Sequence, residues 1–137
     1  MTDTDQMVVW LRETLDAAQA DAEAAGGDEW RREEHPSDTV AIYDSKGGPV
    51  VYDEGSPTEA QQAHIVRHGP AAVLRRIAAD RELLAECEAI LSDPAMKDYD
   101  RETFGGLLGY RHALAVSLAE VTIRNLAEGY GWKEDHQ

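Results

Sequence analysis

Hydrophobic residues recur every three or four positions in several long stretches of the chain, the spacing that places side chains on one face of an α-helix. The first stretch predicts an N-terminal helix within residues 1–26, running from about position 5 to position 25. Thr4 or Asp5 is suited to cap its start, and Gly26-Gly27 is suited to stop it. The predicted inner face comprises Val8, Leu11, Leu15, Ala18 and Ala22.

Between residues 28 and 54 the helical spacing gives way to short β-branched and aromatic runs. Residues 39–43 and 49–52 flank the turn sequence of residues 44–48, which predicts an antiparallel β-hairpin. The charged residues 29–33 are candidates for a third strand at the edge of the sheet, but the sequence does not decide whether this strand forms. Because an isolated hairpin is marginal in water, we expect it to pack on a helix.

Residues 56–91 predict a broken helix. Ser56 is the expected cap, followed by a proline and, three residues after Ser56, by Glu59. Gly69-Pro70 divides the stretch, and the longer second helix ends near residue 91. The apolar stripe of that second helix comprises Val73, Ile77, Leu84, Cys87 and Leu91.

The last predicted helix, residues 107–128, is apolar on two faces, a pattern typical of a helix enclosed by others. We therefore predict one α+β domain over residues 1–137, mainly α, with helices packed around a central C-terminal helix and a small antiparallel β-hairpin. One of the two faces comprises Leu107, Leu114, Leu118 and Val121. The other comprises Val116, Ala119, Ile123, Leu126 and Tyr130.

Charge narrows the classes of function. The 137 residues hold 27 acids and 13 bases, a net charge of −14, and residues 1–57 hold 14 of the acids with 4 bases, or −10. Such a chain repels phosphates and anionic lipids at long range, so we expect neither direct nucleic-acid binding nor membrane binding. The acidity either keeps the protein soluble or lets its N-terminal half mimic nucleic acid in a basic groove of another protein.

Other sequence features point to a cytoplasmic protein. No apolar run approaches eighteen residues, and the acidic N-terminus lacks the features of a signal peptide. The single cysteine, Cys87, excludes an intramolecular disulfide framework and a multi-cysteine zinc site. Its place on an apolar helical stripe favours packing over catalysis.

The segment VYDEGSPTEAQQAHIVRHGPAAVLRRI, residues 51–77, is distinctive. Together with the N-terminal helix, Trp30 and the late LAEGY at residues 126–130, it resembles a family of small proteins from actinobacteria and their phages, catalogued as a domain of unknown function. The resemblance implies a soluble helical domain of that origin and supplies no activity.

Two kinds of site are candidates. His64 and His68, four residues apart on a predicted helix, could bind one metal ion if a third ligand joined them; capping of the helix end is the simpler interpretation. We identify no catalytic residue and expect no cofactor. The candidates for contact with a protein partner are Glu33, Glu34, Asp53, Glu54 and Trp132.

Our leading hypothesis from the sequence is therefore a non-enzymatic accessory protein that binds another protein. A narrower form is a phage-encoded inhibitor or nucleic-acid mimic. The alternatives are a metal-dependent enzyme centred on His64 and His68, and a homo-oligomeric structural component.

Overall fold

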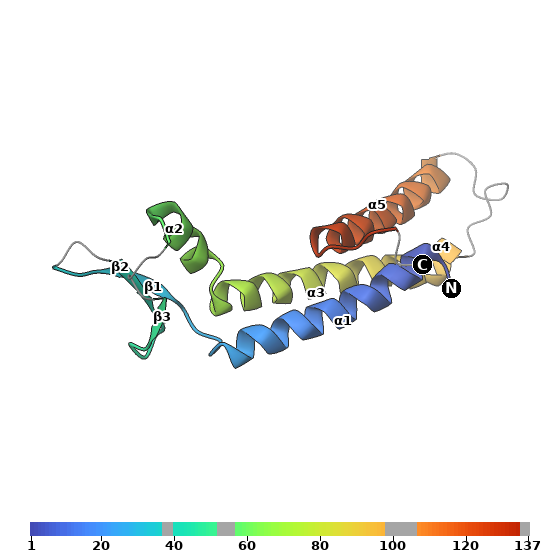
Figure 1. Cartoon of the computed structure of the whole chain (residues 1–137). Coiled ribbons are helices and arrows are strands. Elements are labelled where there is room, and N and C mark those ends of the chain that lie inside the picture. The colour runs from blue at the N-terminus through green and yellow to red at the C-terminus, as the bar shows by residue number, and fades with distance from the viewer. Residues whose placement is uncertain (37–39, 52–56, 98–106, 135–137) are drawn as a thin grey trace. The chain divides into compact units, whose positions relative to one another are not determined.

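The computed structural model describes residues 1–36, 40–51, 57–97 and 107–134 (Figure 1). They form two compact units. The helical unit comprises residues 1–15 and 79–137, and the sheet unit comprises residues 16–78. The boundaries fall inside two long helices, and the prediction of a single domain remains a prediction. In chain order the elements are α1 (Asp3–Ala24), β1 (Arg31–Glu34), β2 (Val40–Tyr43), β3 (Pro49–Val51), α2 (Glu59–Arg67), α3 (Pro70–Ser92), α4 (Pro94–Lys97) and α5 (Leu107–Gly129).

The sheet unit contains a three-stranded antiparallel sheet in the order β1-β2-β3, so the predicted hairpin and the optional third strand are both confirmed. The Asp44 carboxylate closes the β2–β3 turn by accepting the backbone N–H groups of Lys46 at 2.9 Å and Gly48 at 2.7 Å. Gly47 has a φ of +81°, which explains glycine in this turn. Ile42, in the central strand, is fully buried and anchors the sheet.

Helix α2 begins later than the sequence predicted. Its cap is Thr58, whose hydroxyl accepts the N–H of Gln61 at 3.2 Å while the Gln61 side chain accepts the N–H of Thr58 at 2.8 Å. This reciprocal pair is a capping box. It makes Thr58 the cap because Gln61 lies three residues after Thr58, where its side chain can reach back to the N–H of Thr58. The choice of Ser56 as the cap, with Glu59 as its partner, was wrong, and Ser56 itself lies outside the described residues.

Helix α1 also begins differently from the prediction. Thr2 caps it by accepting the N–H of Asp5 at 3.1 Å, and the Asp5 carboxylate accepts the N–H of Thr2 at 2.9 Å. The helix therefore starts at Asp3, two residues before the predicted start at position 5. Its end is as predicted, because Gly26 and Gly27 both have positive φ values and bond back to carbonyl groups of the last turn.

In the helical unit, α5 packs on α1 and α3, as predicted for the C-terminal helix (Figure 1). Its inner side carries Ala119, Ile123 and Ala127, all at most 2% exposed. The expectation that both apolar faces of α5 are buried was wrong. Two neighbouring helices cover one side of a helix, and the other side stays in water. The buried apolar residues contributed to this unit by α1 and α3 are Met7, Leu11, Leu15, Leu84 and Cys87.

None of the helices in the described part of the chain combines the length and the apolar character needed to cross a lipid bilayer.

Candidate functional site

The predicted histidine pair lies at the corner where α2 ends and α3 begins, within the sheet unit. The imidazole rings of His64 and His68 are 4.5 Å apart between centroids, and both side chains are exposed. Trp30 packs closely against the backbone of the corner at Gly69, where an added Cβ would lie 3.5 Å from the Cβ of Trp30. The N–H of Ala71 donates to the carbonyl oxygen of Asp28 at 3.1 Å. These contacts tie the start of α3 to the segment that leads into β1.

The electrostatic surroundings of this corner are positive. Desolvation by the surrounding atoms lowers the pKa of His68 below its ordinary value, and the neighbouring charges of His64, Arg76 and Arg67 lower it further. Neither Arg67 nor Arg76 forms an ion pair with any residue that the structure describes. The nearby Arg75, by contrast, binds the Glu29 carboxylate at 2.5 Å.

These surroundings bear on the hypothesis that His64 and His68 bind a metal. Within the described ranges no group of three or more histidine, cysteine, aspartate or glutamate side chains is close enough to hold a metal ion. Two imidazoles leave a tetrahedral site half filled, and adjacent guanidinium groups repel a divalent cation. The geometry therefore suits an anion better than a metal ion, and metal binding stays a prediction.

The candidate partner-binding residues fall in different places. Glu33 and Glu34 are exposed on β1, at the edge of the sheet, and Glu33 lies 3.5 Å from Arg31. Asp53 and Glu54 lie outside the described residues. The structure therefore places Glu33 and Glu34 on a solvated edge of the sheet.

Trp132 packs back onto the helical unit. Its indole meets that of Trp10 edge to face, with ring centroids 5.3 Å apart. Its backbone N–H donates to the carbonyl of Ala127 at 2.9 Å. Trp132 also lines a cavity of about 320 Å³. The lining residues are Asp3, Gln6, Met7, Arg124, Trp132 and Glu134.

That cavity is poorly suited to an anion. The Arg124 guanidinium already bonds the Glu134 carboxylate at 3.2 Å, and Asp3 adds a further negative charge. The contact with Trp10 makes Trp132 a C-terminal latch that packs on α1. Contact of Trp132 with a protein partner remains a prediction.

Cys87 is buried, 4% exposed, on α3. Burial raises the pKa of its thiol; a hydrogen bond with Thr122 lowers it, and the neighbouring Glu86 and Glu88 raise it further. The thiol is therefore protonated at neutral pH, which agrees with its predicted packing role.

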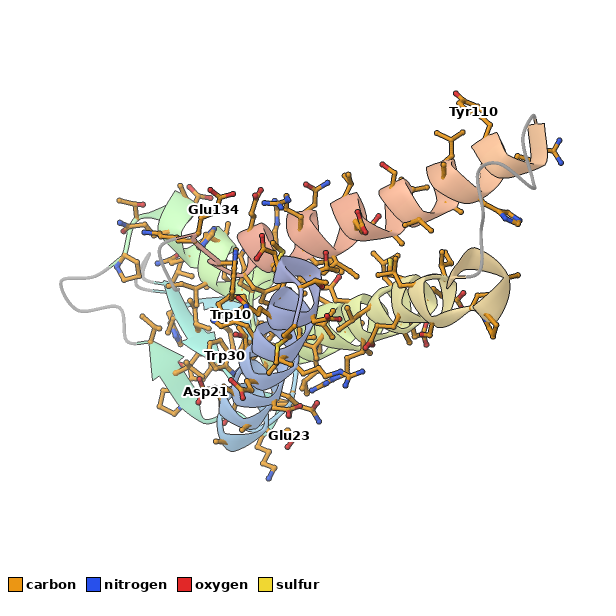
Figure 2. All side chains as sticks on the ribbon, turned by 90° about the vertical axis from the view of Figure 1, so that its right-hand side faces the viewer. Trp10, Asp21, Glu23, Trp30, Tyr110 and Glu134 are labelled. Carbon is orange, nitrogen blue, oxygen red and sulfur yellow. The ribbon has the colours of Figure 1, made fainter. Side chains whose placement is uncertain are left out.

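The sequence analysis missed an exposed apolar stripe along α5. The fractional exposures are 63% for Tyr110, 50% for Leu114, 68% for Leu118 and 49% for Val121. Figure 2 shows Tyr110 near the N-terminal end of α5, directed away from the other helices of its unit. The signal was present as the second apolar face of this helix. It was interpreted as core because periodicity does not distinguish a second buried face from a binding face.

Comparison with known proteins gives a family and no activity. The model of a family of unknown function, DUF6221, matches residues 4–137, nearly the whole chain. No curated protein and no solved structure matches the chain.

Proposed function

We propose, from the premise that this chain belongs to the DUF6221 family of unknown function, that it binds a basic protein partner and acts by that contact rather than by catalysis. The observation that carries the proposal is the exposed stripe of Tyr110, Leu114, Leu118 and Val121, called here the α5 stripe. Four large apolar side chains spaced along one helix face are typical of a helix that enters an apolar groove.

The size of the α5 stripe limits what can occupy it. An aromatic side chain has about 150–250 Å² of surface, and leucine and valine have less, so at the exposures found the four side chains together offer at most on the order of 400 Å². A stable interface buries about 800 Å² on each partner. The stripe alone is too small for a stable symmetric dimer, and the partner must gain affinity elsewhere.

Charge favours a basic protein as that partner. The helical unit holds 15 acids and 7 bases, a net charge of −8, so two copies of the chain repel one another as they approach. Between residues 107 and 129 the two arginines balance the two glutamates, so the stripe itself lies on a neutral helix. An apolar groove rimmed with lysine or arginine would match both features.

The narrower proposal is that this partner handles nucleic acid and that the acidic protein occupies its basic groove. An actinobacterial or phage origin and a cytoplasmic setting belong to this narrower proposal. They rest on the sequence resemblance and on the acidic composition.

The test is affinity capture by the full-length chain from a lysate of its native host, at about 50 mM and about 500 mM NaCl. The binding variant carries Leu114→Asn and Leu118→Asn. Leu83→Asn is the matched control, because Leu83 is an exposed leucine of α3, 44% exposed, in the same unit. Circular dichroism establishes that each variant is folded.

Support requires a basic protein that wild type and Leu83→Asn retain, that the double variant loses, and that high salt weakens. Retention of the same proteins by the double variant would refute the role of the α5 stripe. Sedimentation of the purified chain as a dimer that the double variant abolishes would replace the basic partner with a second copy.

A further inference from the structure

The longest stretch without acidic residues lies at the α2–α3 corner. Residues 60–79 contain no aspartate or glutamate and hold three arginines and two histidines, in a chain whose acids outnumber its bases two to one. Four of these five basic residues are His64, Arg67, His68 and Arg76, called here the cationic corner. His64, Arg67 and His68 are three and four positions apart at the end of α2, a spacing that places them on one face, and the rings of His64 and His68 are 4.5 Å apart between centroids. The neighbouring charges of His64, Arg76 and Arg67 also lower the pKa of His68.

Helix capping explains only part of this cluster. His64 and Arg67 lie in the last turn of α2, where positive charge is stabilised by the helix dipole. Arg76 lies in the second turn of α3, toward the positive end of that helix, where the dipole does not favour a cation. Like charges gathered without an acidic partner among the described residues raise the free energy of the folded state, and a bound anion would offset that cost.

The corner is also held in place before any ligand binds. Trp30 packs beneath Gly69, and Ala71 is hydrogen-bonded to the Asp28 carbonyl. His64 and His68, four residues apart across the end of α2, hold their rings 4.5 Å apart between centroids, and both side chains are exposed to solvent. Preorganisation reduces the entropy lost when a ligand is bound.

We propose that the cationic corner binds a small oxyanion of the phosphate type. Guanidinium groups match the oxygen geometry of phosphate and keep their charge at all physiological pH values. The net charge of the whole chain repels long polyanions, which favours a small ligand such as free phosphate or the phosphate of a mononucleotide over nucleic acid. This proposal is independent of partner binding by α5.

The test uses the ring Cε1–H resonances of His64 and His68 in the full-length chain. Inorganic phosphate and AMP are titrated in separate arms near pH 6.5 at constant ionic strength, with chloride as the reference anion. Saturable shifts of both resonances are expected, with a Kd on the order of 1 mM for an exposed site. Bound phosphate is also expected to raise the pKa of His68, because an anion favours the charged imidazole.

Variants make the test specific. Arg67→Gln and Arg76→Gln should each weaken binding at least fivefold. Arg75→Gln removes the same charge from a guanidinium already bound to Glu29 and should change binding less than twofold. Tighter binding of AMP than of phosphate points to a nucleotide as the source of the phosphate, equal binding shows that the site recognises the phosphate group alone, and weaker binding of AMP points to the free ion.

Three outcomes would overturn the proposal. The shifts could grow linearly without saturation, chloride could reproduce them, or Arg76→Gln could bind phosphate as wild type does.

Discussion

Replacing Ile123 by alanine tests which face of α5 lies in the core. Ile123 has no exposed surface, and the substitution removes three carbon groups worth about 2.4 kcal/mol at about 0.8 kcal/mol each. The cavity left behind adds to that cost, while the better helix propensity of alanine returns about 0.4 kcal/mol. We therefore expect the free energy of unfolding to fall by about 2.5–4 kcal/mol.

Leu118→Ala is the matched substitution on the opposite face of the same helix. It also removes three carbon groups, but the side chain is 68% exposed, so only about a third of the transfer free energy applies and the loss should stay below about 1 kcal/mol. Urea denaturation followed by circular dichroism at the helical band measures both variants. Equal losses, or a larger loss for Leu118→Ala, would show that the packing of α5 described above is incorrect.

Other substitutions test single contacts. Trp132→Ala should lower the free energy of unfolding, measured by urea denaturation, by about 1–3 kcal/mol, since the edge-to-face contact with Trp10 is lost; an unchanged free energy of unfolding would count against this packing. The pKa of Asp28 is lowered because its carboxylate accepts hydrogen bonds from the hydroxyl and N–H of Ser45, so this stabilisation is present above the unfolded value of 3.8 and is lost as pH falls through the folded pKa. Asp28→Asn should therefore reduce the acid sensitivity of amide protection at Ser45, measured by hydrogen exchange, and an unchanged pH profile would contradict this. Cys87 should react with a thiol reagent at pH 8 far more slowly in native buffer than in urea, and equal rates would show that the thiol is accessible.

The local signals in the sequence predicted the elements well, because each depends on a few neighbouring residues. The glycine pair after α1, the turn between β2 and β3, and the proline at the start of α3 all act within one turn of backbone. Errors occurred where two local signals competed. The cap of α2 is Thr58, paired with Gln61, where Ser56 had been predicted. The cap of α1 is Thr2, paired with Asp5, so this helix begins before the predicted position. A capping hydroxyl is effective only where its reciprocal partner is also correctly placed.

The candidate sites were predicted less completely than the fold. The spacing of His64 and His68 correctly places the two rings together, because positions four apart on a helix share a face. Arg76 belongs to α3, and its position relative to His68 depends on how α3 follows α2, which no periodic pattern encodes. From the spacing alone, the histidine pair was a candidate for binding a metal ion. The positive charges around the pair in the structure favour an anion instead.

By itself, the sequence determined the secondary structure, the acidity and the kind of fold, because these follow from propensity, periodicity and composition over short distances. Only the tertiary structure decided which apolar face of α5 is buried, since that depends on how many helices are available to cover it. Ile123 and Leu118 are both large aliphatic residues of one helix, and one is fully buried while the other lies mostly in water. The difference arises because α1 and α3 pack on one side of α5 only, and burial of an apolar side chain requires a neighbour to exclude the water.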